Sequence, residues 1–334
     1  MKILFFILVL LFITPNYTTA DTPTGIVTGG TIYELPRWFK SSFLDFSDEI
    51  EQAKAQGKHV MAFMHLDECP YCNRMLEENF FEGDSRNFME ENFDVIGVNV
   101  RGDLEVTWID GNSYTERGLT EHLNTIATPT IVFLDLDGSK VLQLNGYRDP
   151  RSFRYALDYV EAKHYNKETF SDYLSKLNKP DVYEFRSHSL LERVTYFKGY
   201  DKPLMILFED SQCAECDRYH ENTLNHPNVL SAMEGYLFVR LDASSSQKIL
   251  DLHGRVTTPK QWSRDLGLTF RPSLVLFNAG KEQFRADGIQ YHHHLTEGLV
   301  FSKSGYLEYR TLRDFKTAYR EDLLKSGKSV DFSE

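Results

Sequence analysis

Two continuous apolar runs, each long enough for a buried strand, lie at equivalent places in the two halves of the chain. The first covers His59 to His65 (HVMAFMH) and the second covers Leu204 to Asp210 (LMILFED). Each run is followed by two cysteines spaced three residues apart and then by helix-forming residues. Short apolar runs bounded by turn residues predict strands, so both halves predict a strand leading into a helix.

A proline opens a further apolar strand at the same place in each half. Thr128-Pro129-Thr130 leads into IVFLD, and Arg271-Pro272-Ser273 leads into LVLFN. The repeat offset is 144 residues by first cysteine (213 − 69) and 143 by proline (272 − 129). Two agreeing landmarks at this spacing predict a duplicated domain rather than a solenoid repeat.

The segments between these landmarks predict alternating helices and strands. Such alternation favours an α/β fold, and we expect two tandem domains, each with a central mixed sheet flanked by helices. The expected helices cover 73–80, 84–92, 217–222 and 228–234, and the expected strands cover 94–100, 141–144, 236–242 and 283–286.

The domain boundaries follow from local composition. An amphipathic helix is expected from about Ser152 to Leu177, and Pro180 follows it in a polar linker. We expect an extended leader at 21–35, a first domain at 36–178, a second domain at 182–326, and a frayed tail at 326–334. The longer crossover 102–124 of the first half predicts a hairpin or a loop insertion.

Residues 1–20 show the three-part pattern of a secretory signal peptide. Lys2 provides a positive start, Ile3 to Ile13 form an unbroken apolar run, and Thr18-Thr19-Ala20 predicts cleavage after Ala20. The run is short for a bilayer span, and an uncleaved N-terminal anchor is the alternative. No later stretch is apolar enough to cross a membrane, so we expect an exported protein without stable membrane insertion.

The charge balance narrows the classes of partner. Acidic residues outnumber basic residues by 49 to 37, which gives a formal net charge of −12. This excess argues against nucleic acid and anionic membrane surfaces as partners.

The cysteines indicate chemistry rather than scaffolding. All four fall in the two pairs, Cys69 with Cys72 and Cys213 with Cys216. A bond across so short a loop removes little entropy from the unfolded chain. At the start of a helix, unpaired N–H groups and the helix dipole favour the thiolate. Cys69 and Cys213 are therefore the expected nucleophiles, and Cys72 and Cys216 the resolving cysteines.

The two strand-opening prolines are candidates for cis peptide bonds. An ordinary trans proline is the alternative, but the matched spacing from both cysteine pairs favours cis at Pro129 and Pro272. A cis bond turns the preceding backbone outward, so Thr128 and Arg271 are expected to bind an incoming peptide by strand addition.

Other interpretations remain open for the cysteines and their neighbours. One alternative is that all four cysteines bind a single zinc ion. A second alternative, for Cys213 and Cys216 alone, is a structural disulfide. Glu215 places a negative charge within the second pair, which disfavours a thiolate at Cys213, and Arg271 is expected to offset it. His65 is a candidate for tuning the thiolate of Cys69 or is simply a strand-end residue.

Three adjacent histidines, His292 to His294, stand out in the second half. Adjacent side chains on regular structure point apart, so a solvated surface or loop run is the expected arrangement, and we predict no metal site.

The strand, the CPYC motif and the TPT strand about sixty residues later resemble the thioredoxin superfamily. The stretch from Cys69 to Val160 is most similar to the SoxW-like periplasmic thioredoxins, through TIATPTIVFLDLDG at 125–138 and NGYRDPRSFRYALDYV at 145–160. The resemblance covers the second half more loosely. It implies a cis Pro129 facing Cys69, protein thiol-disulfide exchange in the periplasm, and electrons supplied by a membrane reductase.

The chain departs from thioredoxin itself at two places. Thioredoxin has a buried aspartate six residues before its first cysteine, where this chain has Phe63 and Leu207. The residues between the cysteines are Pro70-Tyr71 and Ala214-Glu215 rather than Gly-Pro.

These observations give one leading hypothesis and two alternatives. We expect an envelope thiol-disulfide oxidoreductase that reduces disulfides of protein clients without a cofactor. A disulfide isomerase or oxidase is the second possibility. A partner-binding protein with regulatory cysteines is the third, and the two cysteine pairs are candidates for relaying electrons to each other.

Overall fold

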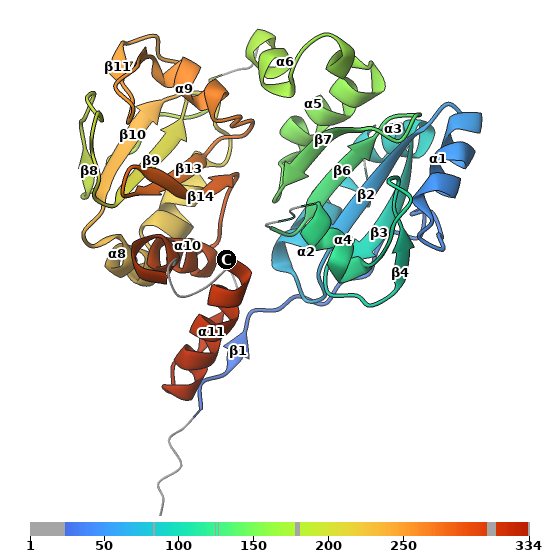
Figure 1. The fold of residues 1–334 in the computed structure, drawn as a ribbon, viewed down its shortest axis with the longest axis horizontal. Coiled ribbons are helices and arrows are strands. Elements are labelled where there is room, and N and C mark those ends of the chain that lie inside the picture. Colours follow the sequence, from blue (N-terminus) through green and yellow to red (C-terminus); the bar gives the residue numbers. More distant parts are fainter. Residues whose placement is uncertain are drawn as a thin grey trace, which may run out of the picture.

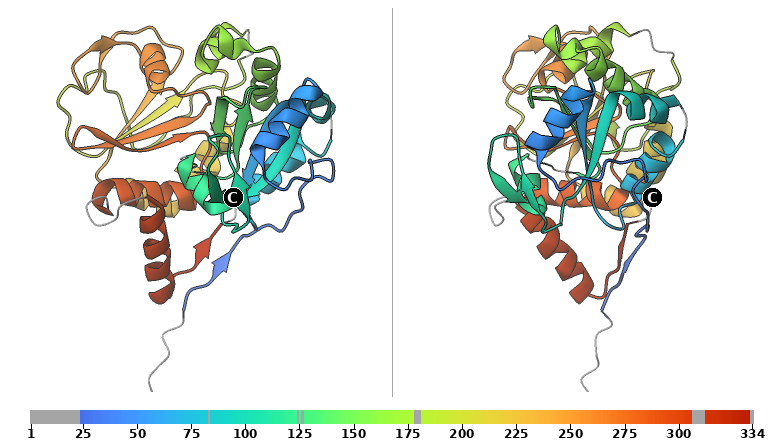
Figure 2. Two further views of the ribbon diagram at one scale, coloured as in Figure 1. Left: turned by 45° about the vertical axis from the view of Figure 1, so that its right-hand side comes forward. Right: turned by 90° about the vertical axis from the view of Figure 1, so that its right-hand side faces the viewer.

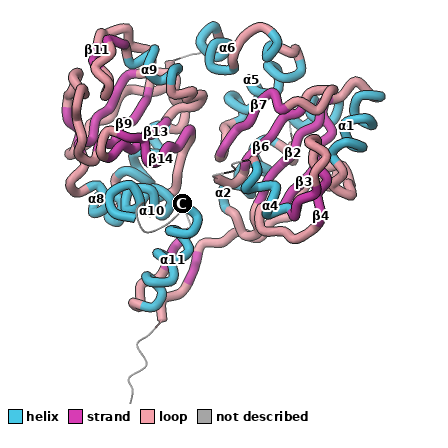
Figure 3. Tube along the Cα trace, viewed as in Figure 1, coloured by secondary structure: helices cyan, strands magenta, loops and turns pink. Residues whose placement is uncertain are grey.

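The computed structural model describes residues 24–82, 84–123, 125, 127–177, 181–305 and 312–332. The predicted signal peptide, 1–20, lies outside the described residues. Two lobes follow one another along the chain, and each contains a sheet with helices packed against it (Figures 1 and 3). This arrangement agrees with the predicted pair of α/β domains.

The first domain is built on a mixed four-stranded sheet in the order β3-β2-β6-β7. Strand β2 pairs parallel with β3 and antiparallel with β6, and β6 pairs antiparallel with β7. The strands are β2 (His59–His65), β3 (Phe93–Asn99), β6 (Thr130–Leu134) and β7 (Lys140–Asn145).

Alternate residues of β2 face opposite sides of this sheet, because successive side chains of a strand point to opposite faces. Met61 and Phe63 pack in a core cluster with residues of α2 (Pro70–Asn79), α3 (Asp84–Asn92) and α5 (Pro150–Glu161). Val60, Ala62 and Met64 pack in a second cluster with α1 (Phe46–Ala55) and α4 (Glu116–His122). Helices on both faces explain why β2 is apolar throughout.

The second domain repeats this plan with one additional edge strand. Its sheet has the order β14-β13-β9-β10-β8, in which β9 pairs parallel with β10 and antiparallel with β13. The strands are β8 (Leu191–Glu192), β9 (Leu204–Glu209), β10 (Leu237–Asp242), β13 (Ser273–Asn278) and β14 (Lys281–Asp287). Its helical elements are α7 (Cys216–Arg218), the π-helix η2 (Tyr219–Leu224), α8 (Pro227–Met233), α9 (Pro259–Asp265), α10 (His292–Val300) and the π-helix η3 (Phe301–Gly305).

The crossover 102–124 contains the predicted hairpin. Strands β4 (Glu105–Thr107) and β5 (Ser113–Thr115) pair antiparallel and lead into α4. The second domain has the same feature, since β11 (Ile249–Leu250) and β12 (Val256–Thr257) pair and lead into α9. The hairpin is therefore part of the repeat and not an insertion peculiar to the first half.

The single helix expected from Ser152 to Leu177 is wrong. Helix α5 ends before Lys163, which adopts a left-handed conformation (φ 52°) and leads into a short 3₁₀ turn, His164–Asn166. Thr169 then caps a new helix, α6 (Phe170–Lys176), by accepting a hydrogen bond from the Asp172 amide. A left-handed residue ends helices routinely, and a threonine cap starts them, so both breaks have local causes.

The frayed tail expected at the C-terminal end is also wrong for the described residues. Strand β15 (Val330–Asp331) pairs parallel with β1 (Val27–Thr28) of the leader, after the long helix α11 (Leu312–Lys325). Figure 2 shows α11 and this two-stranded pair projecting together away from both lobes. The two strands supply backbone hydrogen-bond partners to each other, and neither strand has such partners without the other.

Candidate functional site

The first cysteine pair lies at the junction of β2 and α2. Cys69 is the N-cap residue of α2, Pro70 occupies the first turn, and the Cys69 Sγ accepts a hydrogen bond from the Cys72 amide at 3.1 Å. The two cysteines form a disulfide, and both side chains are buried. The amide groups at a helix start would stabilise a Cys69 thiolate once this bond is reduced.

The strand-opening proline of the first domain lies beside this disulfide. The Thr128-Pro129 peptide bond is cis, as predicted. The Thr128 Oγ1 lies 3.5 Å from the Cys69 Sγ, and the Thr128 carbonyl oxygen lies 3.9 Å from it. The backbone before Pro129 therefore borders the sulfur at which exchange would begin.

The second cysteine pair differs in its helix start, because α7 begins at Cys216 with Glu215 as its N-cap, so Cys213 precedes the helix and the expected placement of Cys213 at a helix start is wrong. Cys213 and Cys216 form a disulfide, and the Arg271-Pro272 peptide bond is cis. Arg271 forms an ion pair with Asp210, with 3.3 Å between Nε and Oδ2. The expectation that Arg271 offsets the charge of Glu215 is wrong, because Glu215 pairs with a residue of the first domain.

That pairing joins the two cysteine motifs. The Arg74 Nη2 donates to both carboxylate oxygens of Glu215, at 3.0 and 3.2 Å. The rings of Tyr71 and Tyr291 stack with their centroids 3.4 Å apart. We call these four residues the domain clasp. Burial raises the pKa of Glu215, and the nearby Arg74 guanidinium only partly opposes this effect.

Three of the four clasp residues lie inside or just after the cysteine motifs, whereas Tyr291 is the N-cap residue of α10. Tyr71 stands between Cys69 and Cys72, and Glu215 stands between Cys213 and Cys216. Each domain thus covers part of the redox motif of the other, and the closed arrangement leaves Cys69 and Cys213 only 6% and 2% exposed.

A buried polar cluster beneath the second disulfide was missed by the sequence analysis. Glu209 is fully buried at the end of β9, and its Oε1 lies 2.8 Å from the His220 Nε2. Tyr183 donates to the other carboxylate oxygen at 3.3 Å and packs in one cluster with Cys213 and Cys216. The His220 Nδ1 is buried without a hydrogen-bond partner among the described residues. A carboxylate–imidazole pair can take up and return a proton at a cysteine nearby.

The first domain has no such pair at the matching positions. At the repeat offset of 144, His220 corresponds to Leu76 (220 − 144) and Tyr183 to Phe39 (183 − 144). Glu209 corresponds to His65 (209 − 144), whose Nδ1 lies 3.0 Å from the Tyr33 hydroxyl. The signal in the sequence was present: Glu209 lies four residues before Cys213, and His220 lies four residues after Cys216.

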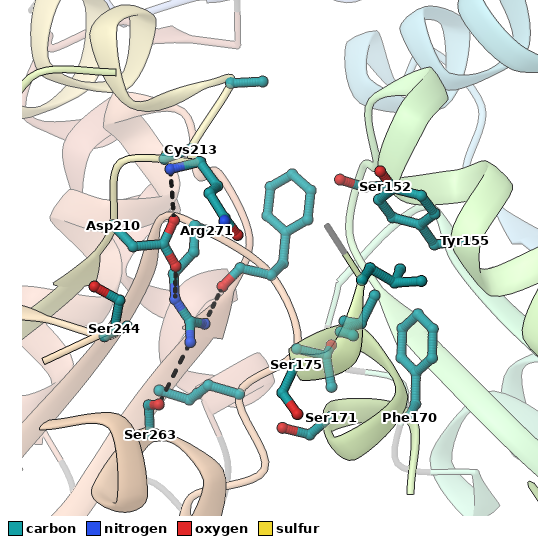
Figure 4. A pocket seen from close by; sticks show the side chains of 18 of the residues that line it. Ser152, Tyr155, Phe170, Ser171, Ser175, Asp210, Cys213, Ser244, Ser263 and Arg271 are labelled. Carbon is teal, nitrogen blue, oxygen red and sulfur yellow. Dashed lines mark hydrogen bonds and ion pairs between the residues drawn. The ribbon is translucent and has the colours of Figure 1, made fainter. Parts of the chain in front are cut away.

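A cleft between the domains reaches the second disulfide. It encloses a cavity of about 220 Å³, with Cys213 among the residues that line it. One wall comes from α5 and α6, including Ser152, Tyr155 and Phe170, and the other from loops that carry Asp210 and Arg271 (Figure 4).

The histidine run does not form the exposed loop that was expected. His292 to His294 open α10, and His292 and His293 are buried. The His226 ring stacks on that of His292 with 3.7 Å between centroids. Within the described ranges, no group of three or more His, Cys, Asp or Glu side chains is arranged to hold a metal ion.

The fold and both sites define the class of the protein. A thioredoxin-type sheet with a disulfide-bonded C-x-x-C pair at a helix start and a cis-proline beside it is the arrangement of thiol-disulfide oxidoreductases. The chain belongs to the family of thioredoxin-like domains, whose model matches residues 46–161 and 192–301. The prediction of tandem thioredoxin-like domains is thereby confirmed.

Individual relatives are more distant. The thiol:disulfide interchange protein DsbD of Pseudoalteromonas atlantica is 28% identical over 127 residues, which are 38% of this chain and 20% of that protein. A thioredoxin-fold protein of Helicobacter pylori is 19% identical and covers 39% of this chain and 91% of its own, with a TM-score of 0.31. A thioredoxin of Thermus thermophilus is 26% identical over 35% of this chain and 83% of its own, with a TM-score of 0.28.

No helix in the described part of the chain combines the length and the apolar character needed to span a bilayer.

Proposed function

We propose that this protein is a periplasmic thiol-disulfide oxidoreductase that reduces disulfides of protein clients through Cys69 and Cys72. The observation that carries the proposal is the placement of Cys69 at the start of α2 beside the cis bond at Pro129. The DsbD relative, named as a thiol:disulfide interchange protein, supports thiol-disulfide exchange. Export by a cleaved signal peptide and the SoxW-like assignment belong to the same proposal.

The chemistry needs the pair in its dithiol form. The Cys69 thiolate attacks one sulfur of a client disulfide, and the other client sulfur leaves as a thiolate and takes a proton. The Cys72 thiolate then attacks the Cys69 sulfur, which releases the client as a dithiol and leaves the Cys69–Cys72 disulfide. Two electrons pass from the pair to the client, and a membrane dithiol reductase is the proposed donor that restores the pair.

The remaining predicted residues have positioning roles in this scheme. The cis bond at Pro129 turns the Thr128 backbone to offer hydrogen bonds to the client beside Cys69, and the cis bond at Pro272 does the same for Arg271 in the second domain. Cys213 and Cys216 form a second exchange site. We retain 36–178 and 182–326 as the proposed domain limits.

Reduction potentials of the two pairs test the proposal. The full chain is measured in dithiothreitol buffers as two double variants, Cys69→Ser with Cys72→Ser, and Cys213→Ser with Cys216→Ser. A potential for Cys69/Cys72 near that of thioredoxin, about −270 mV, supports a reductant. A potential near about −120 mV would instead establish an oxidase or isomerase. Insulin reduction in the presence of a dithiol donor gives the matching turnover measurement.

A further inference from the structure

The cleft beside Cys213 is the starting point, because it joins a redox sulfur to both domains. Cys213 is buried, and Glu215 beside it is covered by Arg74 of the clasp. On its other side Cys213 lines the interdomain cavity, together with the backbone that precedes the cis bond at Pro272. This cleft is therefore the side from which a substrate would approach Cys213.

Positive charge is concentrated in this cleft, although the whole chain is acidic. Its lining holds two carboxylates and five cationic side chains, namely Arg148, Arg151, Lys260, Arg264 and Arg271. The chain carries a net charge of −12, so the lining has the opposite sign to the rest of the protein. A concave site lined by one sign of charge raises the local concentration of ligands of the other sign.

Two of these cations have no carboxylate partner within the described residues, and they stand on opposite walls. The other three are paired: Arg148 with Asp287, Arg271 with Asp210, and Arg264 with Asp172. Arg151 of α5 instead donates to the backbone carbonyl of Gln212, next to Cys213, at 3.0 Å. Lys260 of α9 is exposed on the other wall and forms no ion pair with a described residue.

The rest of the lining suits a polar chain rather than an apolar ligand. Hydroxyl groups come from both walls, including Ser152, Tyr155 and Ser171 on one side and Ser244 and Ser263 on the other (Figure 4). The Ser152 and Ser244 hydroxyls already donate to Asp149 and Asp242, and the buried Ser263 hydroxyl donates to the Lys260 carbonyl. Ser152 and Ser244 are therefore left as hydrogen-bond acceptors for peptide N–H groups of an extended segment.

We propose that this cleft binds an extended segment of a client protein that carries carboxylates beside its cysteine and presents that cysteine to Cys213. Arg151 and Lys260 select the carboxylates, and the backbone at Arg271 pairs with the segment. This inference rests on the proposed function. The reduced Cys213 thiolate attacks the client disulfide, Cys216 then displaces the client sulfur, and the two electrons come from a dithiol donor that first reduced the pair.

The test uses the full chain with Cys69→Ser and Cys72→Ser, so that only the second pair reacts. The pair is reduced with dithiothreitol, desalted, and mixed with hexapeptide disulfides whose cysteines are flanked by glutamate in one set and by lysine in the other. We expect the acidic peptide to react at least about tenfold faster at low salt. Most of this advantage should vanish at 1 M salt, where the screening length is about 3 Å.

Charge reversal locates the effect in the cleft. The double variant Arg151→Glu with Lys260→Glu should remove or invert the preference for the acidic peptide. Lys260→Glu alone should reduce that preference, and because Lys260 is exposed, this substitution disturbs the packing least. Arg154→Glu is the matched control, because Arg154 lies on the same helix and pairs with Asp158 outside the cleft lining. Equal rates for both peptides, or an equal effect of Arg154→Glu, would overturn the inference.

Two further substrates separate the possible failures. Hydroxyethyl disulfide is uncharged, and no reaction with it would refute exchange at Cys213 itself, whereas a normal rate without charge preference refutes only the cleft assignment. Glutathione disulfide tests a short anionic ligand. If the reaction rate saturates at a lower concentration of glutathione disulfide than of the acidic hexapeptide, the assignment to an extended client segment is overturned.

Discussion

Arg74 and Glu215 form an ion pair between the two domains. Arg74 lies on α2, the helix that follows Cys69, and Glu215 lies between Cys213 and Cys216. The Arg74 Nη2 lies 3.0 and 3.2 Å from the two carboxylate oxygens of Glu215. Both side chains are largely withdrawn from solvent, with 12% and 11% of their surfaces exposed. The interface between the domains is therefore built from the exchange motifs, and access to the cysteines is coupled to domain packing.

Breaking this ion pair should expose the cysteines. In Arg74→Ala, Glu215 would remain buried without its partner, and loss of one partner of a buried pair costs about 3–5 kcal/mol. Domain opening relieves this cost, so we expect alkylation of the reduced cysteines by iodoacetamide to accelerate by roughly tenfold or more, since each 1.4 kcal/mol corresponds to about a factor of ten. Small-angle scattering should show a larger radius of gyration.

Arg86→Ala is the matched control for the clasp. Arg86 forms an ion pair with Glu90 one turn away on α3, and both side chains are well exposed. Exposed pairs of this kind contribute little, so alkylation should stay at the wild-type rate. An unchanged rate in Arg74→Ala as well would show that the clasp does not limit access.

The buried Glu209–His220 pair should govern proton transfer at the second site only. In His220→Gln the amide can still donate to Glu209, but it cannot take up a proton. We expect release of a client from its mixed disulfide with Cys213 to slow by roughly 10²-fold, the lower end for general acid–base catalysis. Stopped-flow fluorescence follows that step.

The first site is an internal control for this variant. The Cys69/Cys72 pair has Leu76 at the position that matches His220, so its exchange rate should not change. A parallel slowing of both pairs would indicate a general structural defect instead of a local proton pathway.

The histidines around α10 should make the protein less stable in mild acid. Burial lowers the pKa of His226, His292 and His293, and the effect is largest at His293. Above the ordinary pKa, 6.5, these groups are neutral in both the folded and the unfolded chain. As the pH falls below this value, the unfolded chain binds protons that the folded chain resists, so the free energy of unfolding decreases.

Urea unfolding at pH 7.5 and 5.5 checks this expectation. The midpoint should be lower at pH 5.5, and the double variant His226→Phe with His292→Phe should show a smaller difference between the two values. His253→Gln, which changes an exposed histidine, is the control and should retain the wild-type difference. A midpoint that rises on acidification would contradict the argument.

Much of the fold could be predicted because the duplicated landmarks are local. An apolar strand, a cysteine pair and a strand-opening proline each have a short-range signature, and their common spacing placed Pro129 near Cys69 and Pro272 near Cys213. The pairing of β1 with β15 joins segments about 300 residues apart, and no local pattern encodes it. The split between α5 and α6 depends on one left-handed residue, Lys163, in a sequence that is otherwise helix-forming.

The partner of Glu215 was mispredicted for a related reason. Sequence spacing placed Arg271 on the same domain as Glu215 and near the same cysteine. The actual partner, Arg74, comes from the other domain, and only the docking of the two domains brings it there. Contacts within a repeat can be inferred from the repeat, whereas contacts between its copies cannot.

Direct exchange between the two cysteine pairs is a final expectation, because the clasp joins their motifs. Arg74 lies five residues after Cys69 (74 − 69), and Glu215 lies two residues after Cys213 (215 − 213). In the variant Cys72→Ser with Cys216→Ser, glutathione disulfide converts Cys213 to a mixed disulfide, and attack by the Cys69 thiolate would release glutathione and leave a Cys69–Cys213 bond. We expect this intramolecular crosslink in a monomer band, identified by mass spectrometry of the linked peptides. Adding Arg74→Ala should reduce its yield, because the open chain no longer holds the motifs together. If glutathione remains on both cysteines while client proteins are trapped efficiently under the same conditions, the two sites work independently.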